Sequence, residues 1–263
     1  MRLVSYNIWI KIDNNREVSW LLKNLDADFI ALQEACRPNS EEAYPQFRSF
    51  EYIQSELKNS HPYSLFWELW HGSHFEKNWD IYLDFGWDIS QGNALISKYQ
   101  VSKSENSFYQ WEYALFEDTT NFRRDDHPRA VLIGEYIIDD KPMRILNVHG
   151  IWNATRLWDS RTHNQIQHII KKIHESDVPT LVVWDFNLLP TSSDILEMNE
   201  IFRNLVSEYG IVSTRPAFDD GLDIGGIIVD YVFASRHICV ENLTTIDTPI
   251  SDHFPLILDF SIR

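Results

Sequence analysis

Acid, amide and imidazole side chains recur at the ends of apolar, strand-like segments in this 263-residue chain. Asn7 follows the segment VSY, Glu34 follows IALQ, and His149 follows ILNV. Asp185 and Asn187 belong to the motif D-F-N, which comes directly after LVVW. Because α/β sheets gather their ligands at strand ends, we expect these side chains to lie close together.

Three more residues extend this pattern toward the C-terminus. Asp230 lies within the apolar run IIVDYVF, and Asp252 and His253 stand just before the last apolar segment. Each residue has a purely structural reading by itself, such as a turn former, a helix cap or a buried histidine. Together they offer hard oxygen ligands for Mg²⁺ or Mn²⁺, amide donors for phosphoryl oxygens and titratable imidazoles. The recurrence therefore predicts a metal-dependent hydrolytic site.

The N-terminal part of the chain has the pattern of a β-α-β unit. Residues 2–9 alternate apolar and polar side chains in the period-2 manner of a strand. Residues 14–25 carry apolar side chains at helical spacing, and residues 28–34 predict a short buried strand that ends at Glu34. The polar residues Asn7 and Glu34 would then lie at the same edge of a parallel strand pair.

The rest of the chain adds hairpins and helices. Strands at 130–138 and 143–149 flank the turn residues Asp139 to Pro142, which predicts an antiparallel pair. The sequence of residues 70–92 indicates a long surface loop. Other predicted elements are helices at 46–59 and 159–175 and strands at 64–69, 94–97, 180–184, 227–234, 237–244 and 255–261. Hairpins combined with β-α-β units predict mixed sheets covered by helices, in a single domain over residues 1–263.

Composition restricts the class of protein. Hydrophobic residues make up 44% and charged residues 24%, which is typical of a globular domain with a substantial core. No apolar run approaches the ~18 residues that a membrane span requires, so we expect no membrane insertion. The two cysteines are too few for a disulfide framework and fit a reducing, cytoplasmic location. Nothing in the composition implies an obligate protein partner.

The formal net charge of -16 bears on the substrate. A polyanion would meet repulsion from the surface as a whole, which disfavours tight non-specific binding of duplex DNA. A metal ion and a few arginines can still reverse the field inside one cleft. Arg123, Arg124, Arg156 and Arg161 are candidates for that role, although simple surface ion pairs explain them equally well.

The motifs occur in the order that is found in the endonuclease/exonuclease/phosphatase superfamily, which this chain resembles from end to end. That superfamily includes DNases, abasic-site endonucleases, inositol-phosphate phosphatases and neutral sphingomyelinases. The matching segments are SYNI at 5–8, LQE at 32–34, NVH at 147–149, DFN at 185–187, VDYVF at 229–233 and SDH at 251–253. Weaker matches are GNALIS at 92–97, which contains Asn93, and Arg129.

The resemblance implies a four-layer α/β sandwich, in which two packed mixed β-sheets are flanked by helices. It also implies roles for the motif residues, with Mg²⁺ or Mn²⁺ as the cofactor. The implied metal ligands are Glu34, helped by Asn7 and Asp252. His253 would be the general base, oriented by Asp230, while Asp185 would orient the water or act as the base itself. Asn187 and His149 would contact the phosphoryl oxygens. Asn93 and Arg129 would bind the substrate.

One position departs from the superfamily pattern, because Trp184 stands where a glycine usually precedes the D-x-N motif. A tryptophan there could narrow the cleft, pack into the sheet or offer a stacking face. We expect it to contact the substrate and to act on substrate choice. Other tryptophans that could stack bases, or simply pack in loops and core, are Trp67, Trp70, Trp79, Trp87, Trp111, Trp152 and Trp158.

The sequence therefore predicts a divalent-metal-dependent phosphoester hydrolase. A phosphodiesterase acting on nucleic acid is the first expectation, and a small-molecule or lipid phosphoesterase, of the inositol phosphatase or sphingomyelinase kind, is the alternative. A binding module that keeps the fold without turnover is disfavoured because the acid, amide and imidazole groups are all present. A scaffolding protein that uses its aromatic surface is the remaining hypothesis, and an absence of metal affinity would favour it.

Overall fold

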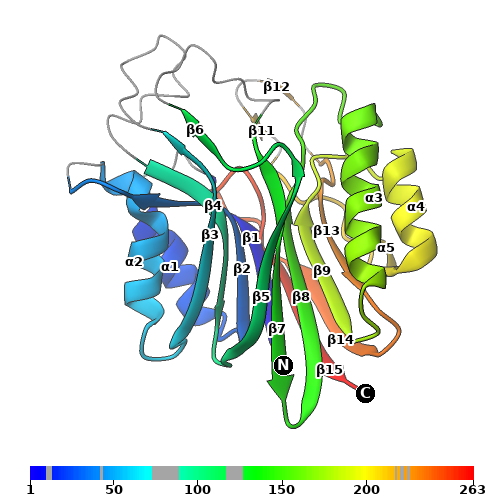
Figure 1. Cartoon of the computed structure of the whole chain (residues 1–263), viewed down its shortest axis with the longest axis horizontal. Coiled ribbons are helices and arrows are strands. Elements are labelled where there is room, and N and C mark those ends of the chain that lie inside the picture. Colours follow the sequence, from blue (N-terminus) through cyan, green and yellow to red (C-terminus); the bar gives the residue numbers. More distant parts are fainter. Residues whose placement is uncertain are drawn as a thin grey trace.

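Two β-sheets pack face to face in the computed structural model of this chain, and helices cover their outer surfaces (Figure 1). The structure describes residues 1–9, 14–41, 44–72, 89–116, 127–216, 218–219, 222–223 and 226–263. A separate two-stranded ribbon joins β11 (Phe218–Asp219) to β12 (Leu222–Asp223).

The first sheet has the strand order β14-β15-β1-β2-β4-β3-β6. Its parallel pair β1–β2 is connected through helix α1 (Asn15–Asn24), which confirms the predicted β-α-β opening. The other neighbouring pairs, apart from the parallel β3–β6 pair, are antiparallel. The strands are β1 (Arg2–Asn7), β2 (Phe29–Pro38), β3 (Tyr63–Gly72), β4 (Ile89–Ser97), β6 (Ala114–Phe116), β14 (Ile238–Thr245) and β15 (Leu256–Ile262).

The second sheet has the order β10-β13-β9-β8-β7-β5. The predicted hairpin joins β7 to β8 through Asp139 and Asp140, whose φ values of 49° and 63° suit a tight turn that follows the twist of the strands. Strands β8 and β9 are parallel and are connected through helix α3 (Ser160–His174). The strands are β5 (Val101–Gln110), β7 (Arg129–Ile138), β8 (Lys141–His149), β9 (Thr180–Asp185), β10 (Arg203–Asn204) and β13 (Asp230–Ala234).

Helices form the two outer layers. Figure 1 shows α1 and α2 (Ser49–Leu57), which follows a 3-10 turn at Pro45–Arg48, beside the first sheet. Helices α3, α4 (Ser193–Ile201) and α5 (Leu205–Glu208) lie beside the second sheet. The predicted four-layer sandwich is thus confirmed. None of the described helices is both long and apolar enough to cross a membrane.

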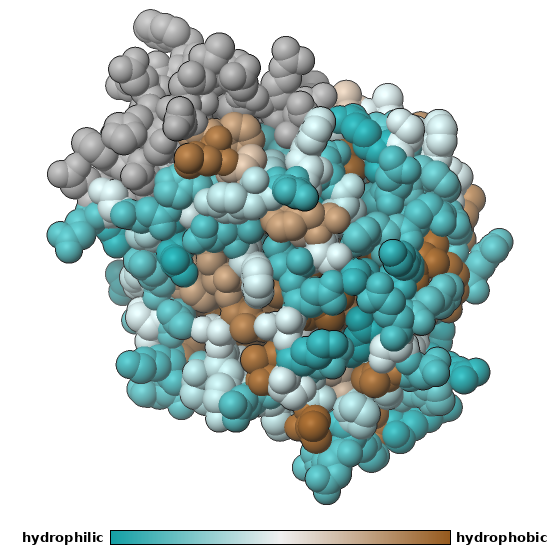
Figure 2. Space-filling model, viewed as in Figure 1, coloured by the Kyte–Doolittle hydropathy of each residue, from teal (hydrophilic) through white to brown (hydrophobic). Residues whose placement is uncertain are grey.

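Adjacent residues of the central strands are buried in different layers of the core. Leu3 packs in the cluster that includes Val131 and Ile145 of the second sheet, whereas Val4 packs with Leu22 of α1. This is the period-2 alternation of a strand that is covered on both faces. Because both faces of these strands are buried, their sequences are continuous apolar runs. On the surface, hydrophilic residues cover most of the face in Figure 2, with small apolar patches between them.

Among the differences between the structure and the sequence-based expectation, two concern strands of the sheets. Residues 70–92 were expected to form a loop, but β3 extends to Gly72 and β4 begins at Ile89; residues 73–88 lie outside the described residues. Strand β5 was not predicted, because its sequence VSKSENSFYQ is mostly polar. It is an edge strand of its sheet and is half-buried along most of its length, so it lacks the apolar pattern of a buried strand.

Candidate active site

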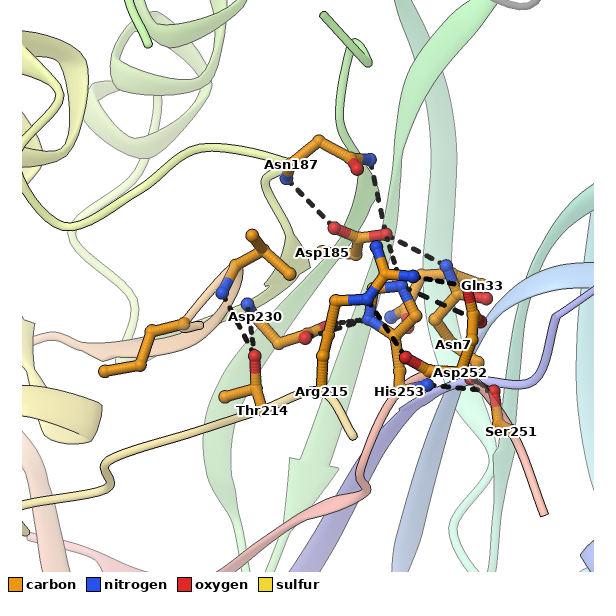
Figure 3. A network of polar contacts seen from close by, with 12 residues as sticks. Asn7, Gln33, Asp185, Asn187, Thr214, Arg215, Asp230, Ser251, Asp252 and His253 are labelled. Carbon is orange, nitrogen blue, oxygen red and sulfur yellow. Dashed lines mark hydrogen bonds and ion pairs between the residues drawn. The ribbon is translucent and has the colours of Figure 1, made fainter. Parts of the chain in front are cut away.

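Three neighbouring strands of the second sheet place their polar residues side by side. His149 ends β8, Asp185 ends β9, and these two residues are paired in the parallel register. Asp230 begins β13, which runs antiparallel to β9, and lies opposite Asp185. Figure 3 shows the resulting network of carboxylate, amide and imidazole groups.

The first sheet contributes Asn7 and Glu34, but Glu34 does not end a strand as predicted. Strand β2 continues to Pro38, and its pairing with β4 shifts between Leu32 and Ala35. At this β-bulge Glu34 adopts a φ of 58°, an unusual value for a glutamate. Bulges commonly redirect a side chain next to an active site. Asn7 is the last residue of β1, so both polar groups lie at the same sheet edge.

Asn7 connects the two sheets through its side-chain amide. The Nδ2 atom donates to Glu34 Oε1 at 3.3 Å and to Asp185 Oδ2 at 2.9 Å. Its Oδ1 atom accepts from the Trp9 backbone N–H at 3.0 Å. In this arrangement the Asn7 amide donates hydrogen bonds to both carboxylates. Its side-chain amide would have to rotate by about half a turn before Oδ1 could bind a cation at that position.

Asp230, His253 and Asp185 form a buried chain of titratable groups. The Asp230 carboxylate accepts from His253 Nδ1 at 2.9 Å, and His253 Nε2 lies 3.7 Å from Asp185 Oδ2. Burial alone would lower the pKa of His253. The carboxylates of Asp230, Asp185 and Asp252 outweigh burial and raise the pKa of His253 to about 9.

Within the D-F-N segment, Asn187 donates hydrogen bonds to the Asp185 carboxylate. Asp185 Oδ1 accepts from the Asn187 backbone N–H at 2.9 Å, and Oδ2 accepts from the Asn187 side-chain amide at 3.3 Å. Asn187 has a φ of 56°, which asparagine tolerates well. Burial raises the pKa of the Asp185 carboxyl, although the charge of His253 opposes this shift. Asp185 is therefore held in place as a desolvated carboxylate.

His149 lies between Asp185 of the neighbouring strand β9 and Glu34 of β2 in the other sheet. Its Nε2 atom is 3.4 Å from Glu34 Oε1 and 3.8 Å from Asp185 Oδ2. The next residue, Gly150, donates its backbone N–H to the Asp185 carbonyl at 2.6 Å. A Cβ atom at Gly150 would lie 2.5 Å from the Phe186 carbonyl oxygen, so only glycine permits this approach of the two chains.

Asp252 is paired with Arg215, which none of the sequence motifs contains. Arg215 donates from Nη2 to Asp252 Oδ2 at 2.6 Å and from Nε to the Asp252 carbonyl at 3.0 Å. Both side chains are largely buried. Arg215 belongs to no strand and to no motif, so only its position in space shows its connection to the site. The adjacent Thr214 hydroxyl accepts from the backbone N–H groups of Val229 and Asp230, which fixes this segment to the start of β13.

Trp184 does not face the substrate side, contrary to the expectation from the sequence. Its side chain is fully buried, and its ring stacks on Phe186. The reason is the alternation of side chains along β9: because Asp185 points toward the site, the preceding residue points to the opposite face. Trp184 is therefore a core residue.

Asn93 and Arg129 are buried and bind backbone carbonyl groups. Asn93 is fully buried and donates from Nδ2 to the Ala130 carbonyl at 3.3 Å. Arg129 is also buried and donates from Nε to the Gly150 carbonyl at 3.1 Å. These contacts support the backbone next to His149. Substrate binding by either residue stays a prediction.

The remaining candidates divide into near and distant groups. Arg156 Nη1 lies 3.5 Å from Asn187 Oδ1, so this arginine reaches the site, whereas Arg161 pairs with Asp159 at 3.0 Å. Trp70 is buried. Among the candidate tryptophans that the structure describes, Trp67, Trp111 and Trp158 have exposed rings and Trp152 is half-buried. The candidates that lie outside the described residues are Arg123, Arg124, Trp79 and Trp87.

The donor set suits a hard divalent cation. Four carboxylates from the two sheets and the segment before β15, those of Glu34, Asp185, Asp230 and Asp252, lie around His149 and His253. Asp185, Asp230 and His253 each offer a ligand atom within 4.8 Å of the others. Concentrated, poorly solvated carboxylate oxygens are the surroundings in which Mg²⁺ or Mn²⁺ is bound. Of the predicted ligands, Glu34 and Asn7 are in contact, while Asp252 Oδ1 lies 3.9 Å from His253 Nε2 and Asp252 Oδ2 is held by Arg215.

Comparison with known proteins shows the family to which this chain belongs. A model of the Endonuclease/Exonuclease/phosphatase family matches residues 4–253. The chain belongs to this family, whose members hydrolyse phosphoester bonds, and the resemblance inferred from the motifs is confirmed. No curated protein sequence matches the chain.

Solved structures share the architecture at low sequence identity. An endonuclease/exonuclease/phosphatase from Beutenbergia cavernae has a TM-score of 0.74 and 14% identity, covering 100% of this chain and 71% of that chain. A mannosyl-6-phosphatase from Bacteroides thetaiotaomicron has a TM-score of 0.66 and 12% identity, with 100% of both chains covered. The human Nocturnin catalytic domain with a bound sulfate anion has a TM-score of 0.66 and 16% identity, covering 100% of this chain and 94% of that domain.

Proposed function

We propose that this protein is a Mg²⁺- or Mn²⁺-dependent hydrolase of phosphodiester bonds, with nucleic acid as the first candidate substrate. The observation that carries the proposal is the buried chain Asp230–His253–Asp185 next to Glu34. It combines a proton acceptor, an oriented imidazole and oxygen ligands in one place. The sulfate recorded with the Nocturnin domain also supports a phosphate-binding role, because sulfate shares the tetrahedral shape of phosphate.

Asp185 is better suited than His253 to accept the proton of the attacking water. Asp230 holds the Nδ1–H of His253, which turns Nε2 toward Asp185 Oδ2 at 3.7 Å. One water molecule or one phosphoryl oxygen could contact both atoms. Because the pKa of His253 is raised to about 9, the imidazole carries a proton at neutral pH and would stabilise a phosphoryl oxygen. The sequence favoured His253 as the base and left Asp185 as the alternative, and this assignment adopts the alternative.

The other side chains would orient the substrate. Asn187 is fixed against Asp185 and can donate to a non-bridging oxygen, as can His149 from the neighbouring strand. Glu34, with Asn7 and the remaining oxygen of Asp252, would hold the divalent cation, and Asp185 and Asp230 lie close enough to contribute. A bound cation would supply positive charge to the phosphoryl and leaving oxygens.

A second candidate function is hydrolysis of a small-molecule or lipid phosphoester. The observation that favours it is the charge around the site. Among the described residues of the network, the guanidinium of Arg215 is already neutralised by Asp252, and carboxylates dominate. A polyanionic strand would gain little attraction there. The mannosyl-6-phosphatase of similar fold acts on a small phosphoester, which supports this alternative.

The test combines a substrate screen with metal removal and one variant. Single-stranded and duplex DNA, RNA, phosphoinositides, sugar phosphates and sphingomyelin are incubated with Mg²⁺ or Mn²⁺, and hydrolysis is expected for at least one class. Chelation should abolish it, and Asp185→Asn should lower kcat by about 10²- to 10⁴-fold. The exposed Asp177→Asn is the matched control. Undiminished turnover in excess chelator, or in Asp185→Asn, would contradict the proposal.

A further inference from the structure

Helices α3 and α4 carry a group of metal-ligating side chains away from the active-site network. His163 lies near the start of α3, and Asp194 and Glu197 lie three residues apart on one face of α4. Each offers one ligand atom, and these atoms lie within 4.8 Å of one another. Figure 1 shows the two helices side by side on the outer face of the second sheet.

Asp194 is the unusual member of this group, because its side chain is only 1% exposed. One carboxylate oxygen, Oδ2, accepts from the Thr162 hydroxyl at 2.7 Å. The other, Oδ1, makes no hydrogen bond of ordinary geometry among the described residues and lies 3.4 Å from His163 Nδ1. A buried carboxylate is costly unless a positive charge compensates it.

We infer that His163, Asp194 and Glu197 form a divalent-cation site between α3 and α4, separate from the active site and suited to Zn²⁺. An imidazole with two carboxylates is a ligand set for Zn²⁺, whereas Mg²⁺ prefers oxygen ligands alone. In a tetrahedral site with bonds of about 2 Å, ligand atoms are about 3.3 Å apart, so small side-chain rotations would close the site.

The surroundings of the three ligands support this inference. Thr162 holds the Asp194 carboxylate, and Gln167 donates from Nε2 to Glu197 Oε1 at 2.7 Å, so both acids are oriented by α3. Such outer contacts orient ligands in metal sites. The His163 side chain is 43% exposed, which gives an ion access from solvent. A bound ion would tie α3 to α4.

The test is a calorimetric titration of the full chain with Zn²⁺ in the presence of excess Mg²⁺, which competes for the carboxylates of the active site. The wild-type protein should bind one equivalent of Zn²⁺ at this site. In His163→Gln and Glu197→Gln this binding should be absent or more than about tenfold weaker. Matched controls on the same helices are His174→Gln and Glu200→Gln, both at exposed positions, which should behave as wild type. Unchanged stoichiometry and affinity in both ligand variants would overturn the inference.

Trp158 provides a second readout, because its ring lies 6.4 Å from that of His163. Co²⁺ bound at this site should quench the fluorescence of Trp158, and the quenched fraction should disappear in Trp158→Phe and in Glu197→Gln. Equal quenching in the wild type and in Glu197→Gln would show that Co²⁺ binds elsewhere. Neither readout depends on catalytic activity.

Discussion

At the scale of single residues, the properties of the site come from a few desolvated charges. Asp185 and His253 are both buried, and each changes the proton affinity of the other. The carboxylates of Asp230, Asp185 and Asp252 hold the proton on His253, while burial favours the neutral form of Asp185. The protonation state of each group, and with it the activity, is therefore expected to depend on pH.

The pH dependence of kcat/KM should be bell-shaped. If Asp185 is the base and charged His253 binds the phosphoryl oxygen, activity is lost as the pH falls through the raised pKa of Asp185. It is also lost as the pH rises through the pKa of His253, about 9 in the metal-free protein. A bound cation favours the deprotonated form of each group and would move both limbs to lower pH.

The measurement is a rate profile on a phosphodiester at fixed saturating Mg²⁺, with His253→Gln as the control. That variant should lose the alkaline limb together with much of kcat. Activity that rises through the pKa of His253 and then stays constant would instead identify neutral His253 as the general base.

At the scale of secondary-structure elements, strand alternation determines what each residue of the D-F-N strand does. Asp185 faces the site, and its neighbour Trp184 lies in the core against Phe186. The bulge in β2 has the opposite effect, because it turns Glu34 out of the regular alternation. The positions of these side chains therefore depend on local strand geometry as much as on residue type.

Replacement of Trp184 by glycine should destabilise the fold and leave substrate affinity unchanged. Removal of a buried tryptophan leaves a cavity, which costs about 3–5 kcal/mol in free energy of unfolding. Equilibrium denaturation should show this loss, while KM of the folded fraction stays near that of the wild type. Trp111→Gly is the control, since Trp111 is exposed and already has a φ of 55° that glycine adopts without strain. A raised KM with unchanged stability would place Trp184 against the substrate.

At the scale of the whole molecule, the net charge of -16 acts on every approaching substrate. The surface in Figure 2 is largely hydrophilic, and acidic side chains outnumber basic ones 39 to 23 over the sequence. Such a protein repels polyanions at long range, and salt screens that repulsion over about 10 Å at 0.1 M. This effect separates the two candidate functions.

If the substrate is a nucleic acid, kcat/KM should increase with ionic strength at constant Mg²⁺, because screening removes repulsion between like charges. For a small phosphoester of low charge, kcat/KM should change little over the same range. Initial rates across a series of salt concentrations test this, and a neutral-headgroup substrate such as sphingomyelin serves as the control. A steep decrease with salt on DNA would mean that a basic surface attracts the strand, contrary to this expectation.

The sequence by itself determined the β-α-β opening, the hairpin at Asp139 and the identity of the polar motif residues, because periodicity and residue chemistry are local properties. Only the tertiary structure decided which groups meet. Arg215 reaches Asp252 across 37 positions of the chain, and Asn7 reaches Asp185 across 178. The position of β5 at a sheet edge and the burial of Trp184 also depend on which strands lie next to each other in space. No pattern within one segment contains that information.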